Sequence, residues 1–124
     1  MRSGRVLLLH NERGEWELPG GRLELGETPE FCVAREIYEE TRISVDVVEI
    51  LDSWMYDITV AKKNVFIVTY GCRAATDAAP VLSHEHKRVG EFTADELPGL
   101  VMPDGYKRSI AAWFTRLGAG NTVG

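Results

Sequence analysis

Six glutamates and a single arginine, Arg35, stand between Glu24 and Glu40. Glu36, Glu39 and Glu40 are spaced i, i+3 and i+4, so in a helix all three project from one face. Like charges at this spacing destabilise a helix by about 0.2–0.5 kcal/mol per pair. The helix dipole makes acidic groups still less favourable towards the C-terminal end. A bound cation would offset both effects.

The chemistry of these side chains favours a hard divalent cation. Carboxylate oxygens suit Mg²⁺ or Mn²⁺, and Mg²⁺ typically combines a few carboxylates with waters and substrate phosphate oxygens. No cysteine or histidine pair has a spacing typical of zinc. Taken alone, three glutamates at this spacing more often form a solvated acidic helix face.

The acidic segment follows a short β-hairpin and a break. Arg5 to His10 is predicted to be a strand that turns at residues 11–14 and returns over residues 15–18, before Pro19-Gly20-Gly21 ends regular structure. Thr28 is an expected N-cap with Pro29 at the first helical position. Helical spacing predicts a buried stripe made of Phe31, Ala34, Ile37, Tyr38 and Thr41.

The rest of the chain predicts three further strands and a last helix. Thr93 to Glu96 has the form of a capping box that begins a short helical turn stopped by Pro98. Asp104 is expected to cap the last helix, which ends at about Leu117. The predicted strands are residues 45–60, 65–74 and 87–92, with a turn at 61–64 and a loop at 75–86, and the inward residues of the last helix are Ile110, Trp113, Phe114 and Leu117.

This order predicts an α/β (α+β) sandwich with one mixed β-sheet between helices. We expect a single domain over residues 1–117 and a flexible C-terminal tail at 118–124. The net charge of −5 argues against a nucleic-acid polymer as partner, and no apolar run is long enough for a membrane span. Cys32 and Cys72 are expected to be buried reduced thiols. The apolar stretch Val6 to Leu9 is too short for the core of a signal peptide, so the protein is predicted to be cytoplasmic.

The segment from Gly21 to Ile43 resembles the Nudix box of the MutT-like hydrolases, Gly-x5-Glu-x7-Arg-Glu-U-x-Glu-Glu-x-Gly-U, where U is a bulky aliphatic residue. The preceding run Trp16 to Gly20 is also similar to the entry of that box. Arg42 stands where the family has glycine, so the expected departure concerns the end of the helix. The matching positions are Gly21, Glu27, Arg35, Glu36, Ile37, Glu39, Glu40 and Ile43.

The resemblance implies a Nudix-type fold and Mg²⁺- or Mn²⁺-dependent hydrolysis of a pyrophosphate bond in a nucleoside diphosphate-linked substrate. It makes Arg35 a residue that orients the glutamates, and Gly21 and Glu27 supporting residues. Glu39 is expected to take part in catalysis as well as in metal binding. The metal ligands that it implies are Gly20 through its carbonyl, Glu36, Glu39 and Glu40.

Other site residues are less directly indicated. Glu85 is the expected general base because family members recruit one from a loop beyond the sheet. Glu91, His84 and His86 are the alternatives. Trp54 and Tyr56 lie on one face of a predicted strand and are expected either to stack on a nucleobase or to pack in the core. Tyr106, Lys107 and Arg108 open the last helix, where they either contact phosphate or form a solvated first turn.

A nucleotide-like small molecule is therefore the expected substrate, with a nucleoside triphosphate first and a nucleotide sugar second. The alternative is a catalytically silent nucleotide-binding or sensor module of the same fold. The strand that commonly precedes the one at Arg5 in the family is missing, which would leave an exposed edge and favour a homodimer.

Overall fold

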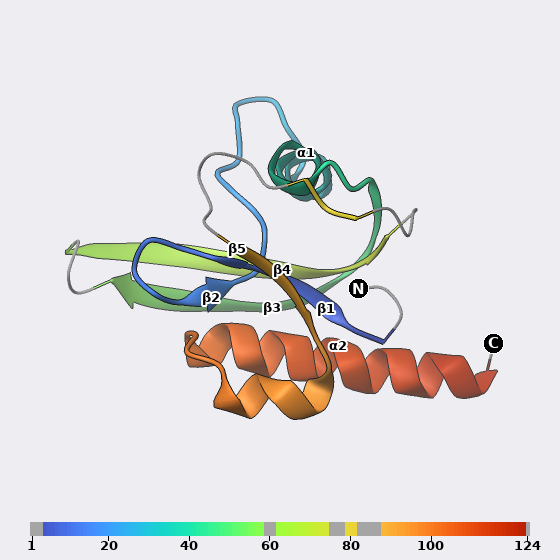
Figure 1. The fold of residues 1–124 in the computed structure, drawn as a ribbon. Helices are drawn as coiled ribbons and strands as arrows, with labels where there is room; N and C mark the ends of the chain where they lie inside the picture. The colour runs from blue at the N-terminus through green and yellow to red at the C-terminus, as the bar shows by residue number, and fades with distance from the viewer. Residues whose placement is uncertain (1–3, 59–61, 75–78, 82–87, 124) are drawn as a thin grey trace.

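The computed structural model describes residues 4–58, 62–74, 79–81 and 88–123, with side chains described up to residue 118. Its elements form three layers (Figure 1). Helix α1 (Pro29–Thr41) covers one face of the strands, and the 3₁₀ helix η1 (Ala94–Gly99) and helix α2 (Asp104–Val123) cover the other. The predicted α+β sandwich is confirmed.

The described strands form two antiparallel sheets in place of the single mixed sheet expected. Strand β1 (Val6–His10) pairs with β2 (Trp16–Glu17) on one side and with β5 (Arg88–Phe92) on the other. Strand β3 (Val45–Ile58) pairs with β4 (Lys63–Ala74). The expectation of an exposed edge on the first strand is wrong, because β1 is the central strand of its sheet.

The β3–β4 ribbon presents alternate residues to the two helical layers. Thr69 donates to Ser109 Oγ of α2 at 2.9 Å, which places this face of β4 against α2. Gly71 lies so close to the Trp113 ring that a Cβ there would overlap it. Val68 and Phe66 alternate with these residues and so point towards the α1 side of the sandwich, where their side chains are exposed.

Helix α1 begins as predicted, and its predicted buried stripe is confirmed in part. The Thr28 hydroxyl accepts from Phe31 N–H at 3.2 Å, and Pro29 occupies the first turn. Phe31 and Tyr38 of the predicted buried stripe are exposed, at 61% and 47%. The buried residues are Cys32, Ile37, Glu40 and Thr41. The predicted stripe is therefore confirmed at Ile37 and Thr41 and wrong at Phe31 and Tyr38. The strands and the loop after Leu18 cover the side of the helix that carries Cys32 and Ile37.

A hydrophobic core cluster lies between β1 and the helices of the lower layer in Figure 1. Leu8 is fully buried there, and Tyr106 and Ile110 of α2 pack against it with Leu97 of η1. Both cysteines are buried and free, as expected. Burial of these apolar side chains thus stabilises the packing of α2 and η1 against the sheets.

Several element boundaries differ from the sequence prediction, and β4 begins at Lys63, inside the predicted turn at residues 61–64. Pro98 lies inside η1, which ends at Gly99, because proline is compatible with the short 3₁₀ geometry. Helix α2 continues past Leu117 through residues 118–123, which were expected to be a tail. Neither α2 nor any other helix in the described part of the chain combines the length and the apolar character needed to cross a membrane.

Arg42 ends α1 in the left-handed conformation that glycine usually supplies. Its φ is 61° and its ψ is 19°, and its N–H donates to Tyr38 O at 2.7 Å. The Arg42 guanidinium lies 5.4 Å from the centre of the Tyr38 ring, a cation–π contact. The helix therefore ends with the glycine-type geometry of the resembled motif although the side chain is arginine. For a residue with a Cβ this conformation costs roughly 1–2 kcal/mol.

We predict that the free energy of unfolding of Arg42→Gly is about 1 kcal/mol higher than that of Arg42→Ala. Both variants lose the cation–π contact, but only alanine has a Cβ that disfavours the left-handed conformation. Urea denaturation of the two purified variants measures this difference. An alanine variant as stable as the glycine variant would contradict the left-handed end of α1.

Candidate functional site

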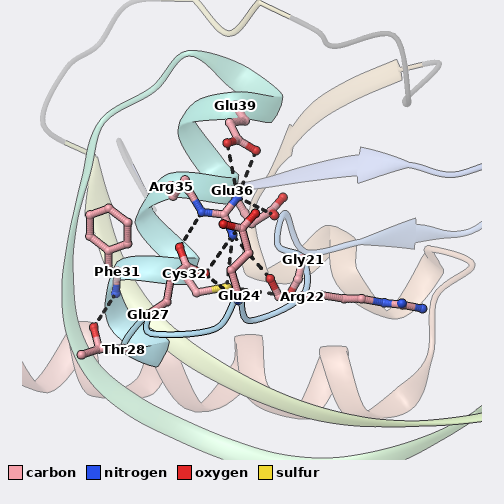
Figure 2. A network of polar contacts seen from close by, with 10 residues as sticks. All are labelled: Gly21, Arg22, Glu24, Glu27, Thr28, Phe31, Cys32, Arg35, Glu36 and Glu39. Carbon is pink, nitrogen blue, oxygen red and sulfur yellow. Dashed lines mark hydrogen bonds and ion pairs between the residues drawn. The ribbon is translucent and has the colours of Figure 1, made fainter.

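Arg35 lies at the centre of the acidic cluster, on the face of α1 beside the loop that follows Gly21 (Figure 2). Its guanidinium contacts the carboxylates of Glu27, Glu36 and Glu39 and lies 3.7 Å from Glu24 Oε1. The Arg35 side chain is only 18% exposed, so this cation is held among the acids and away from solvent.

Glu27 forms the tightest contact with Arg35. Arg35 Nε donates to Glu27 Oε2 at 2.6 Å and Nη2 donates to Oε1 at 3.0 Å, a two-point pairing. Glu27 Oε1 also accepts from the Glu24 N–H at 2.8 Å. The bonds from Arg35 come first in lowering the pKa of Glu27 to about 2, and the same bonds raise the pKa of Arg35. Gly26, at φ +86°, supplies the turn that brings this carboxylate back to the helix.

Glu36 and Glu39 share a single nitrogen of Arg35. Nη1 lies 2.9 Å from Glu36 Oε1 and 3.2 Å from both oxygens of Glu39. The two carboxylates are thereby held on either side of a positive charge. Glu39 is half exposed, at 54%, whereas Glu36 is 19% exposed, so the open side of the cluster is the side of Glu39.

Two consecutive glycines run across the glutamate face of α1. The Gly20 N–H donates to Glu40 Oε1 at 2.8 Å, although Glu40 is only 5% exposed. The next residue, Gly21, touches the Glu36 carboxylate so closely that a Cβ would overlap it. A side chain at Gly21 would therefore push the loop away from the helix, which explains the need for glycine here.

The oxygen atoms of the three helix glutamates and of Gly20 are chemically suited to bind a hard cation. To hold one together, the glutamate side chains would have to move from their present positions. The donors are all oxygens, and a positive group already lies between Glu36 and Glu39 in the form of Arg35 Nη1. Within the described ranges, no three Asp, Glu, His or Cys side chains converge as a ready metal-binding group. Rotation of Glu36 and Glu39 away from Arg35 would be needed to add them to Glu40.

A cavity of about 710 Å³ opens beside the two glycines. Residues of β1, in one sheet, and of β4, in the other, line it together with Val33 and Ile37 of α1. Most of the lining side chains are apolar, and the volume falls in the range of small-molecule sites. The acidic cluster and the cavity thus share the Gly20–Gly21 segment as a common wall.

The structure brings together the residues of the resembled box and separates them from Trp54 and Tyr56. Trp54 packs edge-on against Tyr106 of α2, with ring centres 4.9 Å apart, and over Gly105. Tyr56 Oη donates to Glu15 Oε1 at 2.7 Å. Trp54 therefore belongs to the layer opposite α1, in agreement with the core-packing alternative.

The cations at the start of α2 have protein partners. Arg108 Nε lies 2.9 Å from Asp52 Oδ2, and this bond comes first in lowering the pKa of Asp52. Lys107 Nζ donates to Pro98 O at 3.2 Å. Both groups lie on the face away from α1, so the alternative of phosphate contacts from this turn gains no support.

The candidate general bases are placed only in part. Glu85, His84 and His86 lie outside the described residues. Glu91 lies on β5 opposite Leu7 of β1, so both side chains point to the same face of the sheet. Leu7 and its neighbour Val6 both line the cavity, and Glu91 is not among the residues that line it.

One residue of this region was not singled out from the sequence. Arg22 follows the glycine pair and lines the cavity with Gly20 and Gly21. An arginine directly after a double glycine carries no periodicity that reveals its orientation. Its position beside the cavity follows only from the path of the loop across α1.

The comparisons with known proteins agree with this arrangement. The model of the NUDIX domain matches residues 1–114. The chain is 39% identical over 96 residues to a MutT-like protein of Streptomyces ambofaciens, which covers 77% of this chain and 59% of that protein. It is 48% identical over 44 residues to an 8-oxo-dGTP diphosphatase of Proteus vulgaris, covering 36% of this chain and 39% of that one. The chain therefore spans about three-fifths or less of these two relatives.

A solved structure extends the similarity to the fold. The crystal structure of a MutT protein from Methanosarcina mazei Go1 aligns with a TM-score of 0.72 and 27% identity. The alignment covers 97% of this chain and 87% of that one. The layers described above are thus those of known members of this group.

We predict that the stabilisation contributed by the Glu27 carboxylate is lost at low pH. Because its folded pKa of about 2 lies below the ordinary value of 4.5, the contribution is complete above that ordinary value and disappears as the pH falls through about 2. The difference in free energy of unfolding between wild type and Glu27→Gln should therefore be constant near neutral pH and shrink at acid pH. Denaturant titrations in metal-free buffer at several pH values measure it.

The matched control is Glu24→Gln. Glu24 lies 3.7 Å from Arg35 and is 69% exposed, so its pair should contribute little at any pH. The assigned pairing would be contradicted if the stability difference between wild type and Glu27→Gln stayed unchanged down to about pH 2. It would also be contradicted if Glu24→Gln showed the same dependence of stability on pH.

Proposed function

Since this chain belongs to the NUDIX family, we propose that it hydrolyses a pyrophosphate bond in a nucleoside diphosphate-linked substrate. The proposal rests on the glutamates of α1 being gathered around Arg35 at the edge of a cavity of small-molecule size. Such an arrangement pairs an oxygen-rich cation site with space for a nucleotide. The reaction adds water across a P–O–P bridge and releases two phosphate-terminated products.

Glu36, Glu39 and Glu40, with the Gly20 carbonyl, are the residues proposed to hold Mg²⁺ or Mn²⁺. When bound, such a cation neutralises phosphate oxygens and lowers the pKa of a coordinated water. The oxygen-only donor set and the positive nitrogen now held between Glu36 and Glu39 support this assignment.

The other residues of the cluster set the geometry. Arg35, tied to Glu27 at two points, keeps Glu36 and Glu39 on one side of the helix. Positioned groups of this kind supply most of the acceleration in phosphoryl transfer. Glu85 remains our proposed general base, with Glu91, which lies on the described strand β5, as the alternative.

For the substrate we propose a nucleoside triphosphate first and a nucleotide sugar second. One relative is named an 8-oxo-dGTP diphosphatase, which supports a nucleoside triphosphate, although the match spans 44 residues. The cavity is large enough for a nucleotide, and its apolar walls suit a nucleobase. Water attack on a triphosphate would release a nucleoside monophosphate and pyrophosphate, or a diphosphate and phosphate, according to which phosphorus is attacked.

We predict that Glu39→Gln and Glu40→Gln each lower kcat by roughly 100-fold or more, since a bound metal supplies several kcal/mol of charge stabilisation in such reactions. The folds should persist, because the amide oxygen that replaces the Glu40 carboxylate can still accept the Gly20 N–H bond, and Glu39 is half exposed. Turnover is measured on nucleoside triphosphates, nucleotide sugars, ADP-ribose and dinucleoside polyphosphates, with products identified by mass.

Glu30→Gln is the matched control, since Glu30 lies on the same helix outside the box positions and should leave kcat unchanged. Wild-type turnover in the Glu39/Glu40 double variant would refute the proposed site. Nucleotide binding by the wild type without any product would instead favour a nucleotide-binding module.

We also predict that Mg²⁺ raises the melting temperature of the wild-type protein. A ligand that binds only the folded state stabilises it by about 2.7 kcal/mol at 100 times its dissociation constant. The Glu39/Glu40 double variant should show a much smaller shift, because two of the proposed ligands are gone. Thermal melts over a range of Mg²⁺ concentrations test this without any substrate. Equal shifts in both proteins would place the bound ion elsewhere.

A further inference from the structure

Arg22 is anchored by its main chain and free at its side chain. Its carbonyl accepts from Arg35 Nη2 at 3.4 Å, so the backbone of this residue is tied to the acidic cluster. Gly21, directly before it, lies against the Glu36 carboxylate. The position of the Arg22 Cα is therefore set by the same contacts that hold the glutamates.

The Arg22 guanidinium takes no part in the acidic network. Figure 2 shows its side chain extending away from Glu24, Glu27 and Arg35. Within the described residues no hydrogen bond or ion pair holds this group, whereas Arg13 and Arg108 are each paired with a carboxylate. An exposed arginine side chain that forms no ion pair with the nearby carboxylates is available to bind another anion.

Arg22 is also the only cationic side chain among the described residues that line the cavity. The protein carries a net charge of −5, and the adjoining loop and helix are rich in glutamate. A polyphosphate entering here meets an acidic surface, and bound metal would neutralise only the phosphates that it touches. A guanidinium presents paired N–H donors that match the oxygens of a phosphate group.

We propose that Arg22 binds the terminal phosphate of a nucleoside triphosphate and thereby selects this substrate class over nucleoside diphosphates and their esters. The inference rests on the proposed function and names the substrate class of the same site. The third phosphate of a nucleoside triphosphate adds charge that a nucleoside diphosphate lacks, and it carries more unesterified oxygens than the second phosphate of a nucleotide sugar. It therefore gains most from a cation at the cavity.

Calorimetric titration of Arg22→Ala tests the proposal without turnover. The probes are a guanosine triphosphate analogue with imido groups at both bridging positions, and GDP, each with Mg²⁺. The variant should bind the analogue about 10- to 100-fold more weakly, the loss expected for a charge-assisted hydrogen-bonded contact. Its affinity for GDP should change by less than about threefold, a difference within 1 kcal/mol by the same conversion. Steady-state kinetics on GTP should show the loss mainly in KM.

Two further variants separate a specific contact from a general charge effect. Arg22→Lys keeps the charge but loses the paired donors, so its affinity for the analogue should lie between those of wild type and Arg22→Ala. Arg73→Ala removes one positive charge from an exposed position on β4 outside the cavity lining, and should bind both probes like wild type. Melting temperatures verify that each variant is folded.

Equal affinity of wild type and Arg22→Ala for the analogue would overturn the inference. If Arg22→Ala lost equal affinity for the analogue and for GDP, Arg22 would contact a phosphate that both probes share. If Arg73→Ala lost as much affinity as Arg22→Ala, the effect would be one of net charge. Either result would also overturn the inference. These outcomes are distinct from failure of the proposed function, in which the wild type itself would bind neither probe and turn over no substrate.

Discussion

The candidate site depends on one electrostatic constraint, the need to hold several carboxylates together at the surface of a single helix. Arg35 meets it by contacting Glu27 at two points while its remaining terminal nitrogen lies between Glu36 and Glu39. Without a central cation these groups would repel one another along α1. The pairing with Glu27 is the tightest of these contacts. It holds the guanidinium from the side of the loop, so that Glu36 and Glu39 are oriented towards the same nitrogen.

The glycine pair answers a second constraint, which is steric. Glu40 is buried, and its carboxylate is satisfied by the Gly20 N–H, while Gly21 passes against Glu36 where no Cβ fits. A buried carboxylate without such a donor would be strongly destabilising. The loop therefore lies on the acidic helix face at main-chain distance. This brings a backbone carbonyl, the glutamates and the mouth of the cavity into one small region.

The sandwich supplies the cavity through the separation of its two sheets. Strands β1 and β4 both line it, and the helices of the two outer layers close it, with Ile37 on one side and Ile110 on the other. Large apolar side chains such as Trp113 fill the space under β4, where Gly71 allows α2 to approach. The same packing that stabilises the lower layer thus leaves room between the sheets beside α1. The cavity and the carboxylates of α1 then meet at the loop after Leu18.

Local patterns in the sequence determined much of this protein, including the strands, the Thr28 cap, the box and the grouping of its acids, because each depends on residues a few positions apart. Helical spacing correctly predicted that Ile37 and Thr41 of α1 are buried, and tertiary structure decided that Phe31 and Tyr38 are exposed. It also turned Trp54 towards α2 and left the Arg22 side chain beside the cavity. These outcomes rest on contacts such as Gly20 with Glu40, twenty residues apart. Helical periodicity shows that a helix has two kinds of face, and only the elements packed against it determine which one becomes the interior.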